Sequence, residues 1–424
     1  MAESAQTGEP GIRPYPEGKG LKYNHLEERC ASYLRTLCRE IPERCVGSEG
    51  NRRATAFFRR EISSFGWRAE AEELEVIDWA DGGAELRAAG REFKVLAGPY
   101  ALGCSLEAPL AAASSPEELE RVEVAGRVLL LHGPIAAEQL MPKNFVFYNP
   151  EEHQKIIALL ERKQPAAIVS ATGRNPALAG GVYPFPLIED GDFDIPSAYT
   201  TEETGRELLA LAGRKVFLES RSARIPAKAY NVTAEKREGS NGRIVFTAHI
   251  DARKGSPGAI DNAAGVAALL LLAGLLRDYQ GRRRLEIVAL NGEDYYSAPG
   301  QMAYLKKNEG SFGDIALNVN IDGAGYREGG TAFSCFSLPP EIKEKAGRVI
   351  GEFAGISEGE PWFQGDHGIF IQQGCPAIAV TSRWFLENMA TQAITHTKLD
   401  TPEIVDCLQL VEIARALDRL ARLL

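Results

Sequence analysis

From Tyr230 onward, short apolar runs alternate with segments of helical character. Four runs have the length and composition of buried strands: Ile244–His249, Leu285–Leu290, Ile315–Ile321 and Ala377–Val380. Between the first two lies an unbroken apolar stretch, Ala263–Leu276. It is shorter than the ~18 residues that span a bilayer, so we predict a buried helix. This alternation predicts an α/β layer with a mainly parallel sheet.

The first half of the chain has a different pattern. Asn24–Cys38 and Asn51–Phe65 show the apolar spacing of amphipathic helices, and Arg68–Val76 and Glu85–Arg91 have strand composition. From about Pro99, strand signals such as Arg127–His132 alternate with loops rich in Pro and Gly. A chain of 424 residues is too long for one hydrophobic core. We therefore predict two domains, one of which is a small strand-rich module in the middle of the chain.

The chain ends with the pattern of a long amphipathic helix. Thr401 is placed to cap this helix and Pro402 to occupy its first turn. One apolar stripe at helical spacing follows, formed by Leu410, Ala414, Leu417, Ala421 and Leu424. This stripe predicts a helix that packs against the core.

Composition and charge exclude some classes of partner. The net charge is -10, which argues against a nucleic-acid groove or an anionic membrane surface, since both require a basic face. The polar segment 1–20 has no apolar core of the kind a secretory signal needs. The seven cysteines are scattered and form no C-x-x-C pair, so neither a disulfide framework nor a thiolate zinc site is expected. A cytoplasmic location is the resulting expectation.

His249 and Asp251 stand two residues apart at the end of a predicted strand. Strand side chains alternate, so both would face the same side. An imidazole that binds zinc usually donates its other N–H to a carboxylate, and Asp251 is suited to that role. The alternative is a strand end that simply enters a polar turn.

Two further pairs lie at the mouths of loops. Asp261-Asn262 precedes the buried helix, where an ordinary helix cap is the alternative to metal binding, and one residue can bind metal while its neighbour caps. Glu293-Asp294 follows the strand Leu285–Leu290. Adjacent carboxylates there repel each other and lose hydration, which is costly unless a cation is present. The useful division is one carboxylate on metal and one free as a base; solvated turn charges are the alternative.

Asp322, His396 and the pair Asp366-His367 complete the set. Taken singly, each is explained as a turn aspartate or a solvent-facing histidine. However, three of the six histidines of the chain fall in these segments. Two histidines and three aspartates suffice for a pair of metal ions, and zinc takes nitrogen and oxygen ligands. The ordered set therefore predicts a metal centre.

From about Tyr230 to its end, the chain resembles the co-catalytic zinc aminopeptidases, the family of bacterial leucyl aminopeptidase, aminopeptidase Y and glutamate carboxypeptidase II. The matching pieces, in order, are Ala248–Asp251, Gly258–Gly265, Asn291–Asp294, Asn320–Asp322, Gly365–His367, and Thr395–Thr397 with Asp400-Thr401. The resemblance implies a three-layer α/β/α zinc-exopeptidase domain, built from residues 21–90 and 226–424. It also implies that the inserted residues 91–225 are similar to a protease-associated domain.

The resemblance also implies a role for each residue. His249 would bind one of two zinc ions and His396 the other, Asp261 would bridge them, and Asp294 and Asp322 would complete the two sites. Glu293 would be the general base, and Asp251 would orient His249. Asp366 and His367 would lie close to the site without binding metal. Cobalt or manganese could occupy the same nitrogen and oxygen ligands.

Two positions depart from the family pattern. The glutamate pair common in the family is Glu293-Asp294 here. Relatives often use a tyrosine before the last histidine to polarise the substrate carbonyl, and no tyrosine lies between Pro361 and His396. Arg383 or a backbone N–H is the substitute that the sequence offers.

The prediction is thus a zinc-dependent aminopeptidase that acts on short peptides. One alternative is a carboxypeptidase or a glutaminyl cyclase on the same scaffold. A free amine requires carboxylates in the substrate pocket and a free carboxylate requires Arg or Lys, so Arg383 keeps the carboxypeptidase open. Another is a catalytically silent binding protein, which would be expected to lack ligands that are present here. For the inserted domain, a lid and a homodimer contact are both open.

Overall fold

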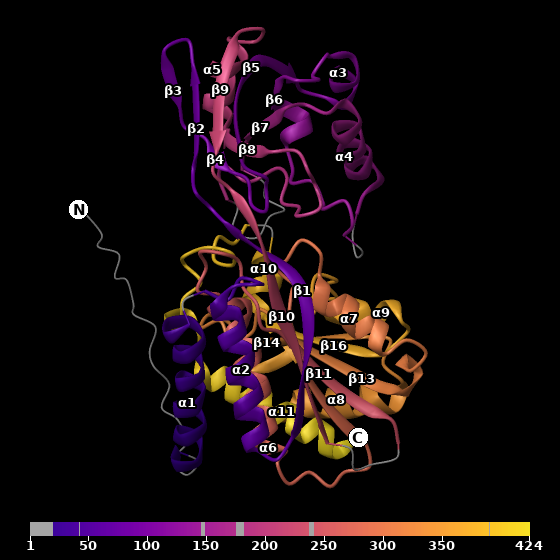
Figure 1. The fold of residues 1–424 in the computed structure, drawn as a ribbon. Coiled ribbons are helices and arrows are strands. Elements are labelled where there is room, and N and C mark those ends of the chain that lie inside the picture. Colours follow the sequence, from indigo (N-terminus) through magenta and orange to yellow (C-terminus); the bar gives the residue numbers. More distant parts are fainter. Residues whose placement is uncertain (1–19, 42, 146–148, 175–181, 237–240, 390) are drawn as a thin grey trace, which may run out of the picture.

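The computed structural model describes residues 20–41, 43–145, 149–174, 182–236, 241–389 and 391–424 (Figure 1). The polar segment at the N-terminus, apart from Gly20, lies outside these residues. The described chain forms two bodies, one above the other, and each is built on an eight-stranded sheet.

The larger body is centred on a mixed sheet. Its strands lie in the order β1 (Arg68–Ala80), β10 (Ala223–Lys236), β12 (Arg284–Leu290), β11 (Arg243–His249), β13 (Ile315–Ile321), β16 (Ala377–Ser382), β14 (Thr331–Phe336) and β15 (Ile356–Glu358). The four central strands, β12, β11, β13 and β16, are parallel. Antiparallel pairs flank them on both sides. The predicted strands all form, and the parallel centre brings their carboxyl ends to one edge, where open α/β sheets bind ligands.

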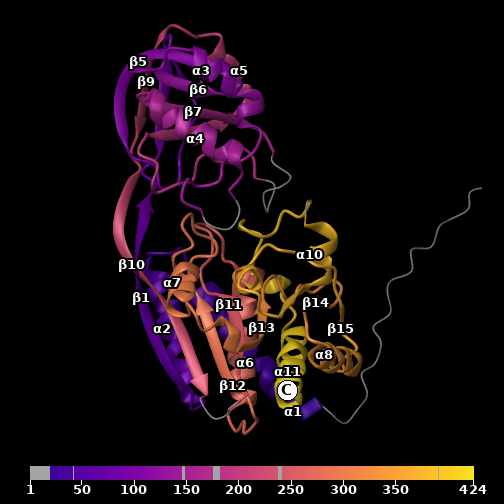
Figure 2. The same cartoon turned by 90° about the vertical axis from the view of Figure 1, so that its right-hand side faces the viewer.

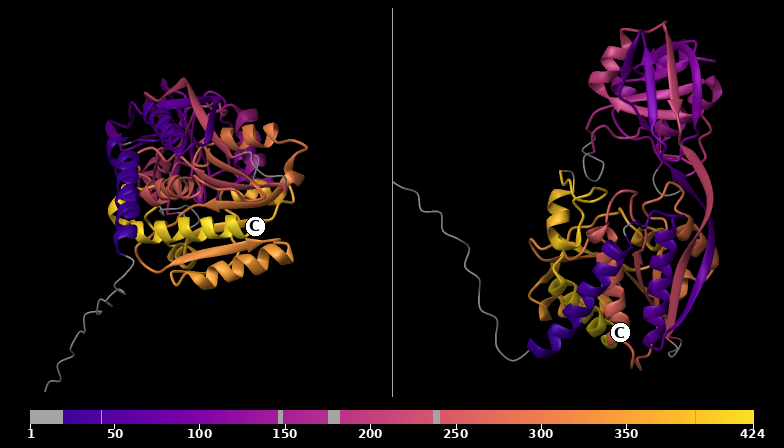
Figure 3. Two further views of the ribbon diagram at one scale, coloured as in Figure 1. Left: turned by 90° about the horizontal axis from the view of Figure 1, so that it is seen from below. Right: turned by 60° about the vertical axis from the view of Figure 1, so that its left-hand side comes forward.

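Alternate residues of the central strands bury against opposite helical layers. Ile244, Phe246 and Ala248 of β11 belong to the largest core cluster, whereas Val245 packs into a separate cluster on the other face. The first face carries α1 (Gly20–Arg35), α2 (Glu49–Ser64), α6 (Ala264–Leu275), α8 (Pro340–Glu352) and α11 (Cys407–Leu423); the second carries α7 (Pro299–Lys307) and α9 (His367–Gln372) (Figure 3). This confirms the predicted three-layer α/β/α architecture.

The apolar run predicted as a buried helix is α6, which is buried over most of its length. It lies between β11 and β12 in the sequence, so it forms a crossover connection of the parallel sheet. In the described part of the chain, no helix has both the length and the apolar character needed to cross a membrane.

The predicted start of the last helix is wrong. Thr401 makes no capping hydrogen bond and Pro402 opens only a short 3-10 turn, Pro402–Ile404. The helix α11 begins at Cys407, where the Asp406 carboxylate accepts the N–H of Leu408 at 2.9 Å. Val405 between them forms a β-bridge with Tyr326, and this tertiary contact holds the chain extended at that point.

The smaller body is rich in strands, as expected. Its sheet has the order β3 (Arg91–Phe93), β2 (Ala84–Ala88), β9 (Lys215–Ser220), β5 (Cys104–Ala113), β6 (Val128–Leu131), β7 (Ala167–Thr172), β8 (Ser197–Thr201) and β4 (Leu96–Ala97). Helices α3 (Pro116–Arg121), α4 (Glu151–Lys163) and α5 (Glu202–Leu209) accompany it. Its likeness to a protease-associated domain stays a prediction.

The two bodies are joined by one long antiparallel pair. Strands β1 and β10 pair from Arg68↔Glu235 to Ala80↔Ala223, and they run from the larger body up to the smaller one (Figure 2). The expected boundary at residue 91 differs from this arrangement, because β2 pairs with β9 and β3 in the smaller sheet. The smaller body therefore begins where β1 ends, and we refer to residues 81–222 as the inserted body.

Candidate metal centre

Two imidazoles and three carboxylates converge at the carboxyl edge of the central strands. His249 ends β11 and is 1% exposed, and Asp322 follows β13 directly. Asp261 lies in the short irregular helical segment Ala259–Ala263, just before α6. Asp294 lies in the loop after β12, and His396 lies in the loop before α11. All five residues that the sequence proposed as metal ligands therefore lie together, although they come from five separate segments.

Asp261 lies between the two imidazoles. Its Oδ1 is 3.0 Å from Nε2 of His249, and its Oδ2 is 3.0 Å from Nε2 of His396. Asp322 Oδ1 lies 3.5 Å from the first imidazole, and Asp294 Oδ1 lies 2.8 Å from the second. Three groups with the spacing of metal ligands result. Two of them share Asp261, and the third consists of His249, Glu293 and Asp294.

The donor atoms of this cluster fit a cation. Both ring nitrogens of His249 and Oδ2 of Asp294 are buried and make no well-formed hydrogen bond to the described residues, although Nε2 of His249 lies 3.0 Å from Oδ1 of Asp261. Buried polar atoms are rarely left without partners, and such orphans at a functional site often mark an ion. Imidazole nitrogen and carboxylate oxygen are the ligands that zinc takes.

The electrostatic environment of the two imidazoles also favours a bound cation. Burial lowers the pKa of His396, but the carboxylates of Asp294 and Asp261 raise it to about 10. Burial likewise opposes the charge of His249, yet Asp322, Asp251 and Asp261 raise its pKa well above the usual range. With no cation present, the carboxylates thus hold protons on both imidazoles. A bound metal ion replaces such protons as the positive charge.

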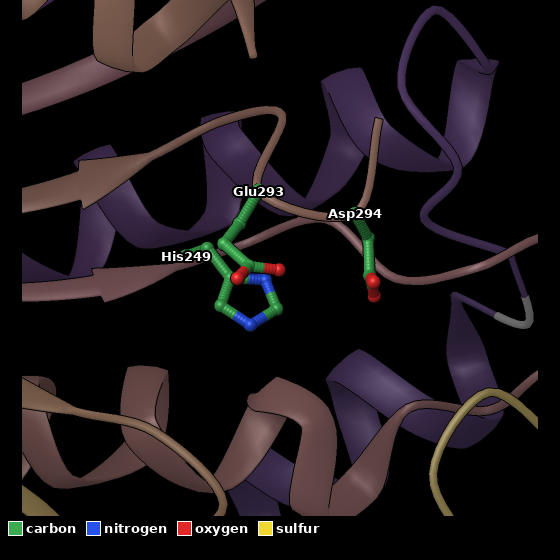
Figure 4. A group of neighbouring side chains, drawn as sticks. All are labelled: His249, Glu293 and Asp294. Carbon is green, nitrogen blue, oxygen red and sulfur yellow. The ribbon is translucent and has the colours of Figure 1, made fainter. Parts of the chain in front are cut away.

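Glu293 lies beside the cluster and has a pKa raised well above its usual range. Burial raises its pKa, and the charges of Asp294, Asp322 and Asp366 raise it further, while His249 acts in the opposite direction. Figure 4 shows its side chain pointing toward the imidazole of His249, with Asp294 next to it. A partly buried carboxyl group with a raised pKa is suited to accepting and returning a proton.

Asp251 has a structural role that the sequence did not reveal. Its carboxylate accepts the backbone N–H groups of Gly292, Glu293 and Asp294, at 2.7, 3.3 and 3.0 Å. It therefore fixes the loop that carries Glu293 and Asp294. Its predicted role as the orienter of His249 stays a prediction, since Oδ1 lies 3.6 Å from Nδ1, beyond hydrogen-bond distance.

Hydrogen bonds to the backbone fix the segment that carries Asp261. The Asp400 carboxylate accepts the N–H groups of Ile260 and Asp261 at 2.6 and 3.1 Å. The neighbour Asn262 accepts the N–H of Gly265 at 3.0 Å and donates to the carbonyl of Ile321 at 2.8 Å. The structure thus shows the expected division, in which Asn262 caps α6 while Asp261 faces the imidazoles.

Arg44 supports the same loop, and no motif in the sequence marks it. It is 1% exposed and has no carboxylate partner among the described residues. Its guanidinium instead donates to four backbone carbonyls, those of Leu37, Ile250, Pro257 and Gly258, at 2.7 to 3.1 Å. It thereby ties the segment after His249 to the segment before Asp261.

Asp366 and His367 lie near the site, each with its own partner. Asp366 accepts from Gln301 Nε2 at 2.7 Å, and burial raises its pKa to about 7. His367 Nε2 lies 2.8 Å from the carbonyl of Trp362, and burial lowers its pKa. Neither belongs to a group with metal-ligand spacing among the described residues. Arg383, proposed as a substrate-facing residue, is instead exposed at the start of α10 (Arg383–Asn388).

The fold is thus a three-layer α/β/α sandwich with a histidine–aspartate cluster at the carboxyl edge of its parallel strands, where such sheets bind ligands. The cluster offers the nitrogen and oxygen ligands that zinc takes. Residues 231–421 match the sequence model of peptidase family M28. Over these residues the chain is similar to members of this family.

The individual relatives are distant in sequence. A probable lipoprotein aminopeptidase of Mycobacterium tuberculosis, LpqL, is 24% identical over 291 residues, which are 66% of this chain and 54% of the relative. The match thus spans about half the length of that protein. A zinc aminopeptidase of Bacillus subtilis has a similar fold, with a TM-score of 0.73 at 16% identity over 93% of this chain and 94% of that one. The aminopeptidase of Aneurinibacillus sp. strain AM-1 gives 0.72 at 17% identity, covering 93% and 92%.

Proposed function

We propose that this chain is a zinc-dependent aminopeptidase that removes the N-terminal residue of short peptides. The observation that carries the proposal is the position of Asp261, whose two oxygens each face an imidazole Nε2 at 3.0 Å. His249, Asp261 and Asp322 would hold one zinc ion, and Asp261, Asp294 and His396 the other. The aminopeptidases among its relatives support the choice of substrate end.

The chemistry that zinc supplies in such a site is Lewis acidity, which activates water as a nucleophile and polarises a carbonyl. Glu293 accepts the proton of the attacking water on a carboxylate oxygen and later delivers it to the nitrogen of the leaving amine. Asp251 keeps Glu293 in reach through its bonds to the backbone of the 292–294 loop. A cavity of about 420 Å³ opens beside Asp294 and His396, which suits a short peptide.

The number of metal ions is the first test. After reconstitution with zinc and dialysis, elemental analysis is expected to find two ions per chain. The variant His396→Ala is expected to retain one, because the group of His249, Asp261 and Asp322 remains complete. His132→Ala, in the inserted body, is the matched control and should retain two. Fewer than one ion per wild-type chain would contradict the paired site.

The reaction is tested with a panel of substrates. Aminoacyl fluorogenic substrates with a free amine are expected to be hydrolysed, and a chelator should abolish the activity until zinc is restored. N-blocked peptides with a free carboxyl end, and peptides with an N-terminal glutamine for cyclisation, serve as the other arms. Turnover of N-blocked peptides alone would indicate a carboxypeptidase, and cyclisation alone would indicate a glutaminyl cyclase.

A further inference from the structure

The cavity beside the metal centre is formed by both bodies. Asp294 and His396 line it from the larger body, and Gln139, Phe185, Glu189 and Tyr199 line it from the inserted body. The inserted body is therefore part of the wall that a substrate at the metal centre would meet. A residue that lines this wall is therefore a candidate for binding the substrate.

Arg253 lies in this cavity, two residues after Asp251. Its Nη1 forms an ion pair with Oε1 of Glu189, and its Nε lies 3.6 Å from Oδ1 of Asp294. The Nε atom is buried and makes no hydrogen bond to the described residues. The side chain as a whole is 27% exposed. Arg253 is thus fixed on one side by the inserted body and remains open to the cavity on the other.

Glu189 is itself held in place. Its side chain is 15% exposed, and its second oxygen accepts a hydrogen bond from Nε2 of Gln139 at 3.0 Å. Both residues belong to the inserted body, whereas Arg253 belongs to the larger one. The contact Gln139–Glu189–Arg253 therefore connects the inserted body to a residue that touches Asp294.

We infer that Arg253 binds an oxygen atom of the substrate beside the metal centre, and that Glu189 is the residue that positions it. This inference rests on the proposed function. A guanidinium carries five N–H donors in a rigid fork and keeps its charge, so one ion pair leaves donors for a second partner. Donors fixed in advance beside a reacting centre stabilise negative charge without reorganising.

The other cations near the site are less suited. Lys254 also lines the cavity, but its Nζ donates to the carbonyl of Trp79 and lies 3.5 Å from Asp78 Oδ1. It also sits 4.8 Å from the centroid of the Trp79 ring, so its charge is already engaged. Arg383 is exposed on α10 and does not line this cavity.

The oxygen bound by Arg253 has two sources in a short peptide. One is the scissile carbonyl, which gains negative charge as water adds to it. The other is the carboxylate at the peptide's C-terminus. A leucyl dipeptide with a free carboxyl end and the same dipeptide as a C-terminal amide separate the two sources, because only the first carries a terminal charge.

The test uses the zinc-reconstituted full chain with the variants Arg253→Gln, Arg253→Lys and Glu189→Gln. The matched control is Asp194→Asn, which removes another ion pair between the bodies, Asp194 Oδ1 to Arg224 Nη1 at 2.7 Å, away from the cavity lining. Zinc content, kcat and KM are measured for both dipeptides. Peptide binding is measured by calorimetry in a Glu293→Gln background, so that it does not depend on turnover.

Arg253→Gln is expected to lower kcat/KM by about 10–100-fold, the effect of losing a charged hydrogen bond, with zinc content unchanged. Arg253→Lys should recover part of this, since it keeps the charge. Glu189→Gln is expected to lower kcat/KM by a smaller factor. It should cause no further loss of kcat/KM when it is combined with Arg253→Gln. Asp194→Asn should leave kcat/KM unchanged. A loss in kcat with both dipeptides identifies the carbonyl; a rise in KM with the free acid alone identifies the terminal carboxylate.

Unchanged kinetics and binding in Arg253→Gln would overturn the inference and leave the proposed function standing. A loss that always accompanies depletion of zinc, in Arg253→Lys as well, would also overturn it, because Arg253 would then only support Asp294. If instead the wild-type chain binds the dipeptide through Arg253 but never hydrolyses it, the proposed function falls and the inference stands.

Discussion

Replacing Glu293 with glutamine is expected to lower kcat by about 10²–10⁴-fold while the metal stays bound. Glutamine has nearly the same shape, so the buried volume and the bonds from Asp251 to the backbone of this loop are preserved. What is lost is the carboxylate that accepts a proton from water in the proposed mechanism. The loss should appear in kcat measured with an aminoacyl substrate, alongside a zinc content equal to that of the wild type.

The neighbouring carboxylate provides the control for this variant. Asp294 Oδ1 lies 2.8 Å from the His396 imidazole, so Asp294→Asn is expected to lose bound zinc, which Glu293→Gln is not. Glu293→Gln should therefore lower kcat without loss of zinc, whereas Asp294→Asn should lower the zinc content. Wild-type turnover in Glu293→Gln, or the same zinc loss in both variants, would contradict the division of roles.

Replacing Arg44 with methionine is expected to lower the free energy of unfolding by about 3–5 kcal/mol. Methionine fills similar space but cannot donate, so four carbonyls, including those of Ile250 and Gly258, lose their partner in a buried place. The segments that carry His249 and Asp261 would also lose the hydrogen bonds through which Arg44 connects them, so we expect weaker zinc binding. Urea unfolding of the zinc-free protein measures the stability, because bound zinc would add its own stabilisation.

Arg35→Met is the matched control for that change. Arg35 forms an ion pair with Glu40 at the surface, where its side chain is 66% exposed, and such pairs contribute little. Its loss should alter the unfolding free energy by no more than about 0.5 kcal/mol. A change in Arg44→Met no larger than that of Arg35→Met would show that the carbonyl contacts are not important for stability.

Local patterns were sufficient for much of the fold. The four central strands of the main sheet and the buried helix α6 form where apolar runs of suitable length occur, because burial on both faces requires such runs. The failure at Thr401 has a tertiary cause: Val405 pairs with Tyr326, and no pattern near residue 401 encodes that bridge. Likewise, β2 is assigned to the inserted body by its pairing with β9, more than a hundred residues later.

The sequence by itself determined which residues meet at the metal centre. His249, Asp294 and Asp322 end or follow successive strands of a parallel sheet, and the carboxyl ends of such strands share one edge. Only the tertiary structure decided what surrounds them. Arg44 meets Ile250 across 206 positions of the chain, and Glu189 of the inserted body meets Arg253. Such contacts depend on where whole elements pack, and no local sequence pattern at either residue predicts its partner.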